Sequence, residues 1–167
     1  MQLNFAQAVL EFLIIKSKTV KTLKLFFFAF VIVSCTSFSK QTNIDPWNAN
    51  QLLAPAELAK TMNDNLLPQP IIICVGPGAL IKNSINIGST HDEQNLQKLK
   101  EKLALFPKNA NIVIYCGCCP FEHCPNIRPA FKLLNDMHFT DQKLLNLEHN
   151  LKVDWIDKGY PSTTNTN

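Results

Sequence analysis

The stretch that decides the fold is Asn111-Ile-Val-Ile-Tyr-Cys116, which a cysteine-rich loop follows at once. Its continuous apolar and largely β-branched side chains are typical of a strand buried on both faces. A second run of this kind, Ile71-Ile-Ile-Cys-Val75, is bounded by Pro70 and by Gly76-Pro-Gly78. Because strands buried on both faces belong almost only to parallel sheets, the two runs predict one parallel sheet.

Helical patterns alternate with these strands. Thr90-His-Asp-Glu93 predicts a capping box, with Thr90 as the cap, that opens a helix over 93–106. The spacing of apolar residues predicts further elements: helices over 55–62, 127–137 and 151–158, and a third strand over 143–147. Strands that alternate with helices predict an α/β fold, in which a parallel sheet is flanked by helices on both faces.

Length and charge indicate one globular domain and give no sign of a nucleic-acid-binding protein. The chain has 167 residues, of which 46% are apolar and 17% charged, and this suits one globular domain with an appendage. Residues 1–34 hold four of the sixteen basic residues and one of the thirteen acidic residues. The remainder is therefore neutral, which gives no support for binding to nucleic acid.

The N-terminal segment predicts export and anchoring. An apolar run of nine residues, Leu25 to Val33, follows four lysines and is shorter than the ~20 residues of a membrane-spanning helix. Ile32-Val-Ser-Cys35 resembles the lipobox of bacterial lipoproteins, which implies lipidation of Cys35 and attachment of the domain to a membrane of the cell envelope, in the periplasm or at the cell surface. We expect a leader over 1–34, an anchor and tether over 35–44, a domain over 45–161 and a disordered tail over 162–167. The alternative is an uncleaved N-terminal helix in which Cys35 is an incidental thiol.

The loop after residue 115 holds the candidate site. Four of the six cysteines fall within nine positions, namely Cys116, Cys118, Cys119 and Cys124, and the only arginine of the chain, Arg128, follows them. In open α/β sheets, ligands bind beyond the carboxyl ends of the strands, where Cys116 is expected. Backbone N–H groups and the N-terminus of the following helix would lower the pKa of the Cys116 thiol. Because the thiolate is the nucleophile, Cys116 is the predicted reactive residue.

The body of the chain resembles the rhodanese-like domains over about residues 47–161. The segments that carry the resemblance are Pro55-Ala-Glu-Leu-Ala59, Ile71–Val75, Ile85-Asn-Ile-Gly88, Ile112-Val-Ile-Tyr-Cys116, Leu145-Asn-Leu-Glu148, Trp155 and Gly159-Tyr-Pro161. The resemblance implies that Cys116 carries a persulfide, and that the loop amides and Arg128 hold an anionic donor or acceptor. Eleven residues separate Cys116 from Arg128, whereas four or five are usual in the family, so the implied active-site loop is enlarged and rich in cysteine. Its accessory residues are Gly117, Cys118, Cys119, His123 and Cys124.

Other interpretations of the loop stay open. Cys118, Cys119, His123 and Cys124, with or without Cys116, offer the ligands that Zn²⁺ or Cu(I) prefers. In an oxidising compartment, Cys118 or Cys119 can form a disulfide with Cys124, or one of the loop cysteines can form a dithiol pair with Cys116. Arg128 can pair with Glu122 instead of binding an anion.

We expect from the sequence an envelope protein of thiosulfate sulfurtransferase type that transfers sulfur through Cys116 and needs no cofactor. Its expected partners are a small-molecule or protein sulfur donor and acceptor, and the membrane through the lipid anchor, but no nucleic acid. The alternative function is a thiol–disulfide or soft-metal-binding module on the same fold, without sulfurtransferase turnover.

Overall fold

The computed structural model describes residues 45–64 and 68–163. The expected leader, the lipidation site Cys35 and the tether to residue 44 lie outside the described residues. Five strands form one parallel sheet in the order β1-β5-β4-β2-β3. In chain order they are β1 (Leu52–Leu53), β2 (Ile71–Cys74), β3 (Ile85–Asn86), β4 (Ile112–Tyr115) and β5 (Gln142–Leu145).

The two apolar runs are parallel neighbours at the middle of the sheet, as the sequence predicted. Ile71 of β2 is paired with Ile112 of β4, and Cys74 is paired with Tyr115. The third predicted strand exists as β5, shifted towards the N-terminus to begin at Gln142. The sequence analysis missed the edge strands β1 and β3, which are two residues long.

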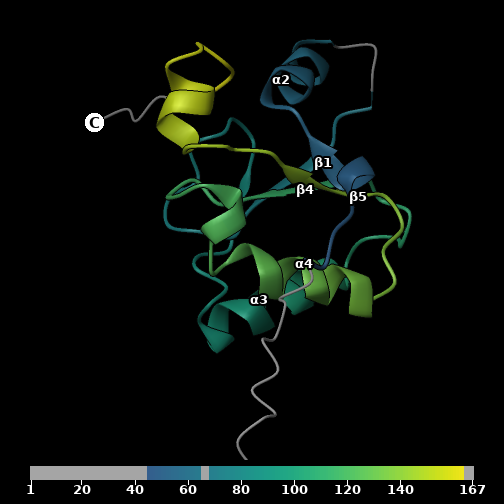
Figure 1. Ribbon diagram of the computed structural model, residues 1–167. Helices are drawn as coiled ribbons and strands as arrows, with labels where there is room; N and C mark the ends of the chain where they lie inside the picture. Colours follow the sequence, from purple (N-terminus) through teal and green to yellow (C-terminus); the bar gives the residue numbers. More distant parts are fainter. Residues whose placement is uncertain (1–44, 65–67, 164–167) are drawn as a thin grey trace, which may run out of the picture. The chain divides into compact units, whose positions relative to one another are not determined.

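Helices cover both faces of the sheet (Figure 1). One core joins α3 (Glu93–Leu103) and α4 (Ile127–Asp136) to the sheet, and the other includes α2 (Pro55–Asn63) and the short π-helical turn η3 (Lys152–Ile156). Two 3-10 turns, η1 (Ala49–Gln51) and η2 (Phe121–His123), complete the described elements. The predicted α/β architecture, a parallel sheet with helices on both faces, is confirmed.

Successive side chains of the central strands point to opposite faces of the sheet, which is why helices must cover both faces. Ile112 and Ile114 of β4 belong to the core under α3 and α4, whereas Val113 and Tyr115 belong to the core under α2 and η3. All four side chains are at most 1% exposed. Burial of each large apolar side chain contributes about 1.5–3 kcal/mol. The burial of these four side chains fixes β4, and with it the position of residue 116, between the two cores.

The helix α3 begins at Glu93 as predicted, but its predicted cap is wrong and it ends three residues before residue 106. Asp92 is the N-terminal cap, and its carboxylate accepts a hydrogen bond from the N–H of Gln94 at 2.9 Å. Thr90 is 1% exposed and donates its hydroxyl proton to the carbonyl of Asn126 at 2.6 Å. Thr90 therefore bridges to the start of α4 and does not cap its own helix.

The C-terminal part of the described chain returns to the sheet. Ser162, which the sequence assigned to the tail, forms an antiparallel bridge with Ile81. The N–H of Thr163 donates to the carbonyl of Leu80 at 2.8 Å. Among the described residues, none of the helices has the length and apolar character needed to cross a bilayer.

Candidate functional site

Cys116 lies directly beyond the carboxyl end of β4, where the parallel sheet places ligand sites. The residue is 1% exposed. Its sulfur packs against the backbone of Gly76, which follows β2: a Cβ atom on Gly76 would lie 2.4 Å from Cys116 Sγ. Glycine at position 76 is therefore a steric requirement for the sulfur's position.

The loop after Cys116 is fastened to the segment between β5 and η3. The carbonyl of Gly117 accepts a hydrogen bond from the N–H of Leu151 at 3.1 Å, and the N–H of Phe121 donates to the carbonyl of Leu147 at 3.0 Å. A Cβ atom on Gly117 would lie 2.9 Å from Leu151 Cβ, so this approach also needs glycine. Phe121 is buried with its ring 6.2 Å from that of Trp47. The long loop is thus a packed structure that turns back towards α4.

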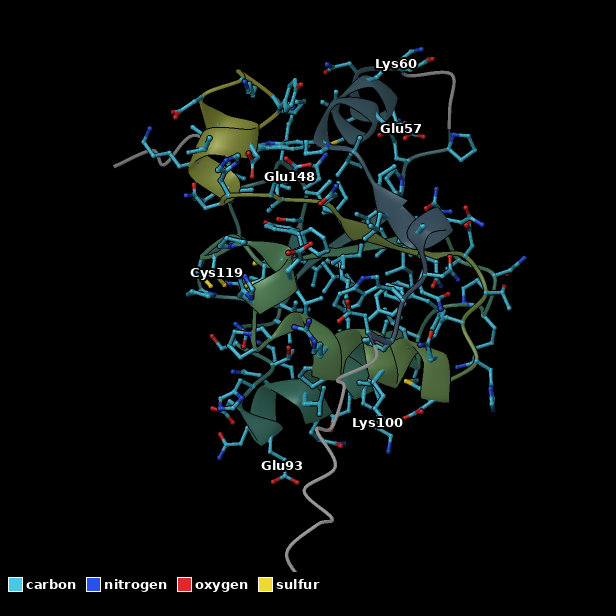
Figure 2. All side chains as sticks on the ribbon, viewed as in Figure 1. Glu57, Lys60, Glu93, Lys100, Cys119 and Glu148 are labelled. Atoms are coloured by element: carbon cyan, nitrogen blue, oxygen red, sulfur yellow. The ribbon has the colours of Figure 1, made fainter. Side chains whose placement is uncertain are left out.

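This folding brings four sulfur atoms together. The Sγ atoms of Cys116, Cys118, Cys119 and Cys124 all lie within 4.8 Å of one another, and we call this group the thiol cluster. Figure 2 shows sulfur atoms gathered beside the labelled Cys119. Cys118 Sγ lies 3.3 Å from Cys116 Sγ and 3.3 Å from Cys119 Sγ. Cys116 and Cys124 are buried, Cys119 is half-buried, and Cys118 is exposed; all four are free thiols.

Asn126 connects the thiol cluster to the surrounding backbone. Asn126 is 4% exposed, and its side-chain amide donates to Cys116 Sγ at 3.5 Å. The orientation of this amide is fixed because its oxygen accepts the N–H of His91 at 3.0 Å. The carbonyl of Asn126 is held in turn by the Thr90 hydroxyl. Asn126 precedes α4 without capping it, so its side chain serves the sulfur and not the helix.

Hydrogen bonds lower the pKa of the Cys116 thiol to about 5, and the largest cause is the hydrogen bond from the thiol of Cys124. Burial opposes this effect, while the backbone N–H of Cys118, the Asn126 amide and the Cys118 thiol add to it. The pKa of Cys124 is raised, first by its hydrogen bond to Cys116 and then by burial. The pKa of Cys118 is raised to about 12, first by burial and then by its hydrogen bonds to Cys116 and Cys119. Near neutral pH Cys116 is therefore a thiolate, while Cys118 and Cys124 are thiols.

Arg128 is directed at the N-terminal end of the described chain. Its guanidinium forms an ion pair with Asp45 at 2.7 Å and lies 5.4 Å from the ring centre of Trp47. The partner is thus Asp45 and not Glu122, the partner that the sequence alternative considered. The resemblance implies that Arg128 binds an anionic donor or acceptor. In this structure the guanidinium is instead paired with the carboxylate of Asp45.

The cluster can act as a nucleophile or as a set of metal ligands. Four thiolates suit a soft cation such as Zn²⁺, which binds sulfur at about 2.3 Å. Among the described residues, the group of possible ligands consists of the four cysteines and does not include His123. His123 lies on η2 with an exposed side chain. Cys116 therefore takes the position that the sequence alternative gave to His123.

The sequence analysis missed two residues of the site. Gly76 and Asn126 contact Cys116 from outside the cysteine run, one after β2 and one before α4. The sequence could have pointed to Asn126, because an asparagine at the start of a helix and next to a cysteine run has a polar side chain that can bond to a neighbouring group. It could not have pointed to Gly76, because the role of this residue depends on a contact between two strands.

Comparisons with known proteins add no relative: no protein-family model matches the chain, and no curated protein or solved structure matches it.

Proposed function

We propose that the protein is a rhodanese-like sulfurtransferase that carries sulfur as a persulfide on Cys116. The observation that carries the proposal is the environment of Cys116 Sγ, which receives hydrogen bonds from Cys124, Cys118 and Asn126 at the carboxyl end of β4. These donors stabilise a negative charge on sulfur. The same donors are placed to stabilise the anionic persulfide that the reaction forms.

The loading step balances without a cofactor. The Cys116 thiolate attacks the outer sulfur of a donor such as thiosulfate, and a bond forms between that sulfur and Cys116 Sγ. The sulfur–sulfur bond of the donor breaks, and sulfite leaves with the electron pair. A nucleophilic acceptor then takes the outer sulfur and returns Cys116 to the thiolate.

The experiment is an intact-mass measurement of the reduced domain after incubation with thiosulfate. We expect a gain of one sulfur atom in the natural protein and none in Cys116→Ser. Cys74→Ser is the matched control, since Cys74 is fully buried in β2 and its thiol meets the carbonyls of Gly76 and Gly78. A hydroxyl has about the size of the thiol and can donate to one of these carbonyls, so this variant should gain sulfur as the natural protein does. Equal gain in Cys116→Ser, or no gain in the natural protein, would refute the proposal.

A second candidate function is supported by the compactness of the thiol cluster. Four sulfurs within 4.8 Å are close enough to surround one soft metal ion, and the pair Cys116 and Cys118 is close enough for thiol–disulfide exchange. The same mass measurement separates these outcomes. Metal binding gives an adduct retained under native conditions, and a disulfide gives a loss of two hydrogens that reductant reverses.

The proposed site of action is the bacterial cell envelope, with the lipid anchor at Cys35 holding the domain to a membrane. The support is the Ile32-Val-Ser-Cys35 segment behind its basic and apolar leader.

A further inference from the structure

Access to the thiol cluster is uneven. Cys116 is 1% exposed and is enclosed by Gly76, Asn126 and Cys124, whereas Cys118 is exposed. Because Cys116 is buried and Cys118 is exposed, a bulky acceptor such as a thiol on a peptide meets Cys118 before Cys116. The sulfur that is best stabilised as a thiolate is therefore poorly placed to meet a large acceptor.

A cavity of about 410 Å³ opens beside the cluster, and Cys118 is the thiol that lines it. This volume falls within the range of about 300–1,000 Å³ that is usual for ligand sites. Leu80, Leu151 and Ile156 supply apolar walls, and Lys152 lies at the cavity with its ammonium bound to both oxygens of Asp157 at 2.8 Å. Cys116 does not line this cavity. The cavity therefore presents Cys118 beside a largely apolar surface.

We propose that Cys118 is a relay residue, which takes the sulfur from Cys116 and delivers it to a thiol on an apolar peptide bound in this cavity. The inference rests on the proposed persulfide at Cys116. It assigns an acceptor class, a peptide or protein thiol with apolar neighbours, and a second catalytic cysteine. The distance of 3.3 Å between Cys116 Sγ and Cys118 Sγ makes direct transfer between the two residues geometrically feasible.

The transfer balances within the protein. Cys118 Sγ attacks the outer sulfur of the Cys116 persulfide and forms a new sulfur–sulfur bond. The bond from that sulfur to Cys116 Sγ breaks and its electron pair returns to Cys116 Sγ, which takes the proton of the Cys118 thiol during the transfer and then releases it to solvent to become the thiolate again. The acceptor thiol then attacks the outer sulfur on Cys118, the bond from that sulfur to Cys118 Sγ breaks, and the proton of the acceptor thiol passes to Cys118 Sγ. The acceptor leaves as a persulfide, and Cys118 is a thiol again. Neither step needs an oxidant or a reductant.

The test compares two acceptors, cyanide and the tripeptide Leu-Cys-Leu, on protein loaded with thiosulfate. In Cys118→Ser we expect the ratio of the tripeptide rate to the cyanide rate to fall at least about tenfold, because both transfers start from the same loaded Cys116 and the ratio cancels any change in loading. Cys119→Ser removes the neighbouring thiol and should slow the tripeptide by less than about threefold. Peptide mapping should locate the added sulfur on both Cys116 and Cys118 in the natural protein, and on Cys116 alone in Cys118→Ser.

The outcomes are distinguishable. A ratio of tripeptide rate to cyanide rate that is unchanged in Cys118→Ser overturns the relay and leaves the proposed function intact. Failure of the natural protein to load overturns both. Ile156→Asp tests the cavity itself, since it places a charge on the apolar wall. We expect a higher KM for the tripeptide with cyanide transfer unchanged, and an unchanged KM would refute the assignment of the cavity to the acceptor.

Discussion

Alkylation of Cys116 by iodoacetamide should be almost independent of pH between pH 6 and pH 8. With its pKa at about 5, the thiol is about 90% thiolate at pH 6 and nearly fully thiolate at pH 8, so its rate should rise by only about 1.1-fold. A thiol of pKa about 8.5 is roughly 0.3% thiolate at pH 6 and roughly 24% at pH 8, which is an increase of about 75-fold. Below pH 5 the Cys116 rate should fall about tenfold per pH unit, because the reactive form is lost as the sulfur is protonated.

The shape of this profile is more informative than the absolute rate. At pH 6 the larger thiolate fraction favours Cys116 by about 300-fold, but nucleophilicity falls with pKa, and over 3.5 units that costs about 25- to 55-fold. The net advantage of roughly five- to tenfold is small enough for burial of the sulfur to hide it. The assay is therefore peptide mapping of the natural domain at a series of pH values, which keeps every neighbouring thiol in place.

Cys124→Ala is the matched perturbation, because it removes the largest cause of the lowered pKa of Cys116. The plateau of the Cys116 rate should then begin at a higher pH. The reasoning is refuted if the Cys116 rate in the natural domain rises between pH 6 and pH 8 in parallel with that of a free thiol such as glutathione. It is also refuted if Cys124→Ala leaves the profile unchanged.

Three further predictions concern other parts of the chain. Asn126→Ala removes one donor to Cys116 Sγ and should raise the pKa of Cys116 by less than Cys124→Ala does, measured by the same profile. Gly76→Ala places a Cβ atom 2.4 Å from that sulfur and should destabilise the domain by about 1–3 kcal/mol in denaturant unfolding, and by clearly less when Cys116 is also alanine; equal losses would contradict the steric argument. Cys35→Ala should move the protein from the detergent-released membrane fraction to the soluble envelope fraction or stall its processing, and unchanged membrane attachment would contradict the lipid anchor.

The central strands of the sheet could be predicted from the sequence, because burial on both faces requires a continuous run of apolar residues. The runs Ile71–Val75 and Ile112–Tyr115 have few polar residues and many β-branched ones, so each identifies a central strand by itself. The edge strands Leu52–Leu53 and Ile85–Asn86 have two residues each, which is too short for a recognisable alternation of apolar and polar residues. Their existence depends on the neighbouring strand, which no local window of sequence contains.

The part of the site that lies in one segment of the sequence could be predicted. The residues that other segments contribute could not. The position of Cys116 follows from the end of a strand, and the density of cysteine predicts a cluster. The partners that determine the chemistry come from elsewhere: Gly76 lies 40 positions before Cys116, and Asp45 lies 83 positions before Arg128. The capping error at Thr90 has the same cause, since its hydroxyl bonds to a carbonyl 36 positions away.

The ion pair between Arg128 and Asp45 sets a practical boundary for producing this domain in isolation. Asp45 is the first residue that the structure describes, and Arg128 is two positions after Asn126, whose amide donates to Cys116 Sγ. The guanidinium is one-third exposed, and its Nε is buried without a hydrogen-bond acceptor among the described residues. A version cloned to start at Trp47 would leave this cation, in the first turn of α4, without its carboxylate. Recombinant versions for assay should therefore begin at or before Asp45.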